Sequence, residues 1–234
     1  MKALILNSGL GTRMGDLTAN HPKCMTELKD GATILSRQLE LLESENIKSI
    51  VMTTGAFDEQ LMEYCQKLSL DLDIKFVKNE KYASTNYIYT IYNAKDYIKD
   101  DDILLLHGDL VFSDDVLKDI INKTTSAMTV SSTVPLPEKD FKAVIENGKI
   151  VKIGVEYFNQ ALAAQPLYKL LKNDWLVWFD KIEEYCERGD VNCYAENAFN
   201  DISEKCNLLP LDVKDRLCTE IDNIDDLERV RTLL

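Results

Sequence analysis

Apolar and polar residues follow two different periods along the first half of the chain, one typical of strands and one typical of helices. Short continuous apolar runs predict four buried strands: 3–6, 49–54, 74–77 and 103–106. Helical spacing of apolar residues predicts helices after these strands: 33–44, 58–68, 86–98 and 113–122. Asp58 is expected as the N-cap of the second helix. Strands that alternate with helices are typical of an α/β fold with parallel strands and helices on both faces of the sheet.

The second half of the chain has a different pattern. Asn147-Gly148 lies between two apolar runs, which predicts a β-hairpin. Further helices are predicted at 173–187, 195–206 and 225–234, and a late strand at 208–213. The aromatic residues Trp175, Trp178 and Phe179 are spaced to form a buried stripe on one helix. We expect one domain over residues 1–234, with a core of about 1–130 and 207–234 and an insertion at about 131–206.

Composition narrows the class of protein. The chain has 234 residues, of which 45% are hydrophobic, and no apolar run long enough to span a membrane, so we expect a soluble cytoplasmic protein. The net charge of −13 argues against nucleic acid as a partner. The six cysteines include no C-x-x-C pair, so we expect reduced, mostly buried thiols rather than zinc ligands or disulfides.

The stretch LILNSGLGTRMG, residues 4–15, joins the first predicted strand directly to a glycine-rich loop. Ligands of open α/β sheets bind at the carboxyl ends of strands. The dinucleotide pattern G-x-G-x-x-G fails here because Met14 stands at the third glycine position, and the P-loop G-K-[ST] ending is absent. Glycines still let backbone N–H groups approach an anion closely. The loop therefore predicts either a phosphate site of a different kind or a tight turn without a ligand.

A carboxylate ends the fourth predicted strand, in the run ILLLHGD. Asp109 thereby lies at the sheet edge where the glycine loop is expected, and Mg²⁺ prefers one or two carboxylates together with phosphate oxygens. The alternative role for Asp109 is the N-cap of the helix at 113–122. Ser113 or Asp114 can serve as that cap instead, so we favour the metal.

Several motifs occur in the order found in one family. The run GLGTRMGDLTANHPK places Gly9, Gly11, Thr12 and Arg13 before Pro22-Lys23, and FVKNEKYASTNYIYTIYNA, LLLHGDLVF and TEIDN follow. The chain resembles the nucleotidyltransferases that couple a nucleoside triphosphate to a sugar phosphate or a small phosphorylated alcohol, and the match covers nearly its whole length. Within the family it is most similar to small cytidylyltransferases that act on phosphocholine or on phosphonates. Asn7-Ser8 stands where the family commonly has Ala-Ala.

The resemblance implies a Rossmann-like, mixed and mostly parallel sheet with helices on both faces and a small acceptor-side lid. It also implies roles for individual residues. Arg13 and Lys23 are the expected catalytic residues: the planar guanidinium suits the β,γ-phosphates, and the compact ammonium suits the α-phosphate and the acceptor. The implied nucleotide-binding residues are Leu6, Asn7, Ser8, Gly9, Gly11, Thr12, Arg13, Lys23, Tyr82, Ala83, Ser84, Asn86 and Gly108.

The second metal ligand is implied by resemblance as well. Asp222 in TEIDN is expected to join Asp109, and Glu220 two residues earlier shares its face in an extended segment. The alternative for Asp222 is the N-cap of the last helix.

Two further segments are implied to contact the substrates, and each has an alternative interpretation. Tyr82, Ala83, Ser84 and Asn86 are expected near the base and ribose, although Asn86 or Thr85 can equally be a helix N-cap. Lys23, Tyr194, Glu196 and Asn197 are expected at the acceptor. Glu196 either accepts hydrogen bonds from an ammonium group or simply occupies a favourable position at a helix N-terminus.

The expected function is a Mg²⁺-dependent transfer of CMP from CTP to a small phosphonate or phosphate. The first choice of acceptor is 2-aminoethylphosphonate, and phosphocholine is the second. A sugar-1-phosphate nucleotidyltransferase and a catalytically silent nucleotide-binding relative are further alternatives. We expect no nucleic acid or membrane partner, while a homodimer and a fusion to a further domain are both compatible with the sequence.

Overall fold

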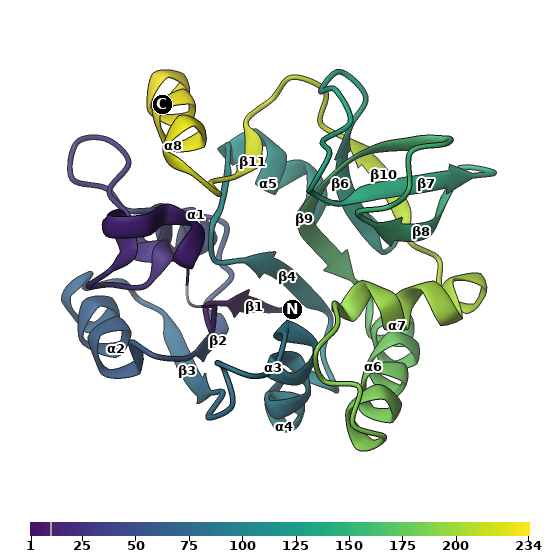
Figure 1. Cartoon of the computed structure of the whole chain (residues 1–234), viewed down its shortest axis with the longest axis horizontal. Coiled ribbons are helices and arrows are strands. Elements are labelled where there is room, and N and C mark those ends of the chain that lie inside the picture. Colours follow the sequence, from purple (N-terminus) through teal and green to yellow (C-terminus); the bar gives the residue numbers. More distant parts are fainter. Residues whose placement is uncertain (10) are drawn as a thin grey trace.

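A nine-stranded sheet forms the centre of the molecule (Figure 1). The computed structural model describes residues 1–9 and 11–234, with all of their side chains except those of Thr12 and Asp16. The strands of the main path are, in spatial order, β10 (Leu209–Asp212), β6 (Ala127–Ser131), β9 (Ala161–Leu170), β4 (Ile103–His107), β1 (Lys2–Leu6), β2 (Ser49–Thr54) and β3 (Asp73–Lys78). The hairpin β7 (Lys142–Glu146) and β8 (Lys149–Gly154) extends from β9, and β5 (Leu110–Phe112) pairs with β11 (Cys218–Glu220) in a separate two-stranded sheet.

The first half of the chain folds as its pattern predicts. β1 pairs in parallel with β2 and β4, and β2 pairs in parallel with β3. The helices between and after these strands are α1 (Ile34–Ser44), α2 (Asp58–Lys67), α3 (Tyr87–Asn93), α4 (Lys95–Ile98) and α5 (Asp114–Ile121). The helix expected at 86–98 is therefore divided in two. Asp58 was expected as an N-cap, but Phe57 holds that position and the Asp58 carboxylate accepts a hydrogen bond from Thr54 Oγ1 instead.

Helices cover both faces of the sheet because neighbouring residues of a strand point to opposite sides. In β1, Ala3 and Ile5 belong to the hydrophobic cluster that includes buried residues of α1, α2 and α5. Leu4, between them, belongs to the cluster formed with α3, α6 (Lys172–Glu187) and α7 (Ala195–Ile202). The expected fold class, a mostly parallel sheet with helices on both faces, is confirmed.

The sheet is mixed because β9 enters it in the opposite direction. β9 lies antiparallel between β4 and β6, with a register shift opposite Met128–Val130. Its sequence ALAAQPLYKL contains several alanines and Pro166, and it was not predicted as a strand. The hairpin at Asn147-Gly148 is confirmed, with φ of 50° and 78° at the two turn residues, as a type I′ turn requires.

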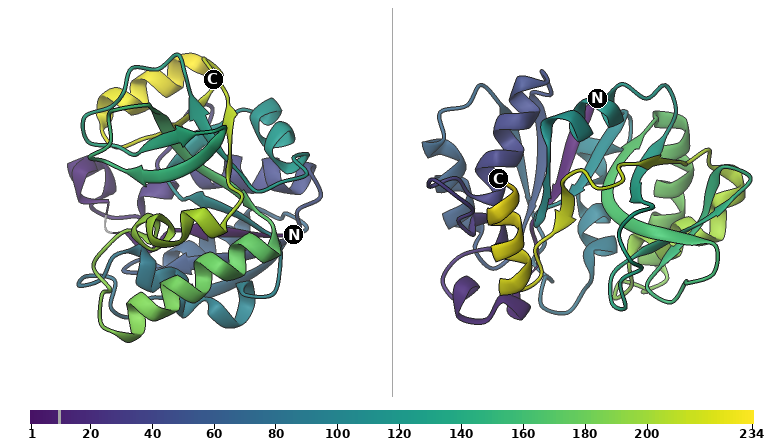
Figure 2. Two further views of the ribbon diagram at one scale, coloured as in Figure 1. Left: turned by 90° about the vertical axis from the view of Figure 1, so that its right-hand side faces the viewer. Right: turned by 90° about the horizontal axis from the view of Figure 1, so that it is seen from above.

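The last three long helices of the chain lie in two separate places. Figure 2 shows α6 and α7 lying together, away from α8 (Ile224–Leu233). The helix expected at 195–206 ends at Ile202 and continues only as the 3₁₀ turn η3 (Ser203–Lys205). The predicted aromatic stripe on α6 is buried, as expected. Within the described residues, no helix is both long enough and apolar enough to cross a membrane.

We expect Trp178→Phe to lower the free energy of unfolding by about 2 kcal/mol, because the smaller ring creates a cavity and the buried Ala195 carbonyl loses its hydrogen-bond donor. The Trp178 ring is 1% exposed, and its Nε1 donates to Ala195 O over 2.9 Å, which ties α6 to α7. Urea denaturation measures the effect. Tyr97→Phe, at an exposed position, serves as the control and should cost less than about 0.5 kcal/mol. Equal stability of the two variants would contradict the proposed anchoring role of Trp178.

Candidate active site

A cavity of about 380 Å³ opens at the carboxyl ends of β1 and β4. Most of the residues predicted from the sequence line it: Leu6, Asn7, Ser8, Gly9, Gly11, Arg13, Lys23, Tyr82, Asn86, Gly108, Asp109, Tyr194, Glu220 and Asp222. These residues come from five separate parts of the chain, and the fold brings them together. The side chain of Thr12 lies outside the described part of the structure.

The glycine loop and the strand beside it require glycine at two positions in particular. Gly11 has a φ of 64°, in the left-handed region, and a Cβ placed there would lie 3.2 Å from Lys23 Cβ. Gly108 follows β4, and a Cβ there would lie 1.7 Å from Asn7 Oδ1. The two loops that end β1 and β4 are therefore in close contact, and only a residue without a side chain fits between them.

Lys23 lies at the centre of the charged groups in the cavity. It begins the 3₁₀ turn η2 (Lys23–Met25), directly after Pro22, and its Nζ donates to Asp109 Oδ2 and to Asp222 Oδ1, each over 2.6 Å. Arg13, in η1 (Thr12–Thr18), donates from Nη1 to the other Asp222 oxygen over 2.5 Å. The Lys23 side chain is 13% exposed.

The charges of this group support one another. Burial lowers the pKa of Lys23, but the two aspartates outweigh burial and raise that pKa above its ordinary value. Burial raises the pKa of the Asp109 carboxyl, but Lys23 and His107 outweigh burial and hold it below its ordinary value. Lys23 is therefore cationic and Asp109 anionic at neutral pH.

The N-cap roles considered for the two aspartates belong to other residues. Ser113 occupies the N-cap position of α5. Asn223 caps α8, accepting from the backbone N–H groups of Asp225 and Asp226. The carboxylates of Asp109 and Asp222 both point to Lys23 instead.

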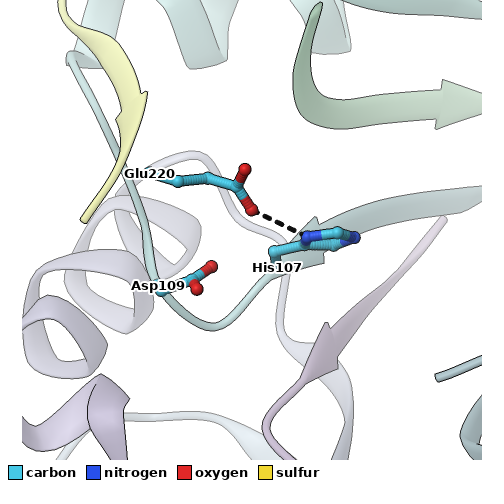
Figure 3. A group of neighbouring side chains, drawn as sticks. All are labelled: His107, Asp109 and Glu220. Atoms are coloured by element: carbon cyan, nitrogen blue, oxygen red, sulfur yellow. Dashed lines mark hydrogen bonds and ion pairs between the residues drawn. The ribbon is translucent and has the colours of Figure 1, made fainter. Parts of the chain in front are cut away.

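Glu220 is held by a histidine (Figure 3). His107, Asp109 and Glu220 present ligand atoms that all lie within 4.8 Å of one another, and His107 Nδ1 lies 2.9 Å from Glu220 Oε1. Burial together with the negative charge of Asp109 raises the pKa of Glu220 to about 7. Burial lowers the pKa of His107, but its hydrogen bond to Glu220 outweighs burial and raises the pKa to about 9. No motif in the sequence indicated that His107 belongs to the site.

These carboxylates fit a divalent cation. Asp109 and Asp222 each bring one oxygen to the same Lys23 ammonium, so the two oxygens already share one cation. Carboxylate oxygens beside a phosphate-binding loop are the donors that Mg²⁺ prefers. Asp109 and Asp222, with Glu220 beside Asp109, are the residues that can hold such an ion.

The loop after β3 supplies part of the wall. Tyr82, Thr85 and Asn86 line the cavity, whereas Ala83 and Ser84 are exposed and do not line it. Asn86 is also the N-cap of α3, because its side chain accepts from Tyr87 N over 2.8 Å. The capping role considered for Asn86 is thus present together with its place in the cavity wall.

A second cavity of about 350 Å³ adjoins the first. The two share Asn86, Phe141, Val155 and Tyr194 in their walls. Glu196 and Asn197, expected at the acceptor, line this second cavity, while Tyr194 reaches both.

Glu196 is 1% exposed and already has two partners. Its carboxylate accepts from Tyr87 Oη and, over 2.7 Å, from Tyr168 Oη. It also stands in the first turn of α7, the position that favours an acidic residue. Its carboxylate is therefore part of a buried tyrosine network at the wall of the second cavity.

The loop before β7 brings residues into the site that the sequence did not indicate. Lys139, Asp140 and Phe141 line the first cavity. Lys142 holds this loop from beneath: it is fully buried, and its Nζ donates to Pro137 O over 2.6 Å and to Asp140 O over 3.0 Å. A buried lysine that binds backbone carbonyls cannot be recognised from its position in the sequence alone.

The glycine loop, the two cations Arg13 and Lys23 and the two aspartates thus meet at one edge of the sheet, as the resemblance to nucleotidyltransferases implies. Residues 3–184 match the family model of the MobA-like NTP transferase domain, and the chain belongs to this family. The nucleotidyltransferase class expected from the sequence is thereby confirmed.

Known relatives extend over the whole chain. It is 27% identical to a CTP:phosphoglutamine cytidylyltransferase of Campylobacter jejuni, covering 97% of this chain and 98% of the relative. It is 25% identical to a choline-phosphate cytidylyltransferase of Haemophilus influenzae, covering 98% and 96%. A CMP-5'-(3-aminopropyl)phosphonate synthase of Streptomyces rubellomurinus is 29% identical over 58% of this chain and 21% of the relative. The fold matches the CTP:phosphocholine cytidylyltransferase structure from Streptococcus pneumoniae with a TM-score of 0.81, at 21% identity, covering 99% of this chain and 98% of that one.

We expect Lys142→Met to loosen the loop at 137–141, because its backbone carbonyls lose a charged donor that lies buried beneath them. Amide hydrogen exchange in this loop should become faster by about tenfold. Lys149→Met, at an exposed position of the same hairpin, is the matched control and should leave exchange at 137–141 unchanged. Unaltered exchange in Lys142→Met would show that the loop is held by other contacts.

Proposed function

We propose that this protein transfers CMP from CTP to the phosphonate or phosphate group of a small acceptor and releases pyrophosphate. The observation that carries the proposal is the Lys23 ammonium, shared by Asp109 and Asp222 beside the glycine loop and Arg13. CTP stands in the name of the Campylobacter relative, and two further full-length relatives are named cytidylyltransferases, which supports CTP as the nucleotide here.

The reaction requires positioning and charge neutralisation more than proton transfer. An acceptor oxygen forms a bond to the α-phosphorus of CTP in line with the bond to the bridging oxygen, which breaks as pyrophosphate leaves. A phosphate or a phosphonate group carries at least one anionic oxygen near neutrality, and the second ionisation of a phosphate has a pKa of about 6, so an attacking oxygen is already deprotonated. The reaction therefore needs no general base from the protein.

The cations of the site have separate roles in this proposal. Lys23, whose side chain is only 13% exposed, binds the α-phosphate and the acceptor oxygens and stabilises the charge that develops between them. Arg13 is more exposed, with 71% of its side chain accessible, and binds the leaving β,γ-phosphates with its planar donor group. Both cations exchange part of their pairing with Asp222 for phosphate oxygens.

Asp109 and Asp222 are the proposed ligands of Mg²⁺, with Glu220 beside them. When bound, Mg²⁺ supplies positive charge that offsets the charge of the triphosphate in a protein whose net charge is −13. The aspartates are then paired with an ion, and Lys23 is free to face the phosphates.

The proposed acceptor is 2-aminoethylphosphonate. Its phosphonate lies at Lys23, and its ammonium end extends past Tyr194 into the second cavity. The described lining of that cavity includes the carboxylates of Glu156 and Glu196 and no lysine or arginine, which favours a cationic end over a second anionic one. The phosphonate in the name of the Streptomyces relative also supports this acceptor.

Phosphocholine is the second candidate acceptor. Phe141 and Tyr194 lie at the boundary of the two cavities with ring centroids 4.9 Å apart. Aromatic faces attract a quaternary ammonium group that has no hydrogen to donate. Two relatives with choline phosphate in their names cover nearly all of this chain.

We expect the purified protein to release pyrophosphate from CTP with 2-aminoethylphosphonate and Mg²⁺. A screen of CTP, UTP and dTTP against 2-aminoethylphosphonate, phosphocholine and hexose 1-phosphates measures this. The kcat/KM with CTP and the phosphonate should exceed that of every other pair by about tenfold or more. A chelator should abolish the release, and added Mg²⁺ should restore it.

Higher activity with phosphocholine would replace the first acceptor by the second. Activity that persists in excess chelator would exclude the metal. CTP binding without turnover by any acceptor would identify a silent relative.

We expect Lys23→Ala to lower kcat by about a hundredfold to a thousandfold, because a preorganised charge at the reacting phosphate is lost. Steady-state pyrophosphate release measures the rate, and circular dichroism confirms the fold. Lys29→Ala removes an exposed lysine six residues further along and should retain the wild-type rate. A wild-type kcat in Lys23→Ala would remove Lys23 from its proposed role.

A further inference from the structure

Ser8 lies directly before Gly9 at the start of the glycine loop, and its hydroxyl is hydrogen-bonded to a helix. The residue is 7% exposed and lines the first cavity. Its Oγ lies 2.8 Å from Thr90 Oγ1, on α3. Distance alone does not say which of the two hydroxyls donates, but the groups behind Thr90 decide it.

The direction of hydrogen bonding is fixed at Asn79, which is 1% exposed and follows β3. A backbone N–H can only donate, and Lys81 N donates to the Asn79 side-chain oxygen over 2.9 Å. The Asn79 amide nitrogen therefore faces the other way. It donates to Thr85 Oγ1 over 3.0 Å and to Thr90 Oγ1 over 2.9 Å.

Thr90 passes this direction on to Ser8. Its oxygen accepts from Asn79, and its own hydrogen requires an acceptor because Thr90 is only 1% exposed. Among the described residues, Ser8 Oγ is the one acceptor within hydrogen-bond distance of that hydroxyl. Thr90 therefore donates to Ser8.

The Ser8 hydroxyl consequently keeps its own hydrogen for a different partner. In the described part of the chain no other group forms a hydrogen bond with Ser8 Oγ, and the residue lines the cavity. A hydroxyl whose oxygen already accepts one bond still has a hydrogen to donate, and a ligand in the cavity that Ser8 lines can accept it.

We propose that Asn79 and Thr90 are positioning residues: they orient the Ser8 hydroxyl so that it donates a hydrogen bond to the base of bound CTP. The inference rests on the proposed function. Ser8 precedes Gly9 and Arg13, which the proposed function places at the phosphates. Through Thr90 and Asn79 it is joined to the loop that carries Tyr82 and Asn86, which is expected at the base and ribose. The base therefore lies on its side of the cavity, and cytosine offers the acceptors O2 and N3.

Calorimetric binding of CTP with Mg²⁺ tests this chain of bonds. Ser8→Ala and Thr90→Val should each weaken CTP binding by about tenfold. Because the two residues act in series, the double variant should bind CTP at most about twofold more weakly than either single variant. Thr90→Ser, which retains the hydroxyl, should restore affinity to within about twofold. Inorganic triphosphate, which has no base, should bind all these proteins equally.

Thr129→Val is the matched control. Thr129 is a buried threonine on β6 whose hydroxyl donates to Gln165 O over 2.7 Å, so its replacement costs stability in the same way. It should leave CTP affinity unchanged, whereas a general loss of stability would affect both threonine variants alike.

Four outcomes would overturn the inference. Wild-type CTP affinity in Ser8→Ala would overturn it, and so would fully additive losses of CTP affinity in the double variant. In both cases CTP turnover by the wild type would still support the proposed function. Equal weakening of triphosphate binding would place Ser8 at the phosphates instead. Absence of CTP binding by the wild type would overturn both the inference and the proposed function.

Discussion

The site depends on one ammonium group that is shared by two carboxylates. Lys23 pairs with Asp109, 86 residues away, and with Asp222, 199 residues away in the sequence. A buried charge without a partner is costly, so the pairing ties the first loop of the sheet to the end of the chain. The backbone strengthens the same junction, because Ile221 N donates to Asp109 O over 3.0 Å. The cations and carboxylates that the proposed chemistry requires are therefore also groups that hold the fold closed.

The sheet explains why these groups meet. β1 and β4 are parallel neighbours, so the glycine loop after one strand and Asp109 after the other lie at the same edge. β11 pairs antiparallel with β5 and brings Glu220 and Asp222 to that edge from the far end of the chain. The β7–β8 hairpin, the loop that Lys142 holds and α7 add further wall to the two cavities.

The sequence predicts local features well and long-range contacts poorly. Buried parallel strands form continuous apolar runs, so β1 to β4 could be recognised. The glycine loop with Arg13 and Lys23 lies in one short stretch of sequence, so it could be recognised as a phosphate site. β9 could not be predicted, because its alanines and Pro166 carry no strand signal and only its neighbours make it a central strand. His107, the loop at 137–141 and the bond between Ser8 and Thr90 depend on tertiary packing, which leaves no pattern in the sequence.

The central claim is that Asp109 and Asp222 hold a divalent cation against the bound nucleotide. Calorimetric titration of CTP into the wild type and Asp222→Asn, with and without Mg²⁺, tests this claim most directly. We predict that Mg²⁺ strengthens CTP binding by the wild type, and that Asp222→Asn loses this increase while still binding CTP without metal. The same increase in both proteins would contradict the account.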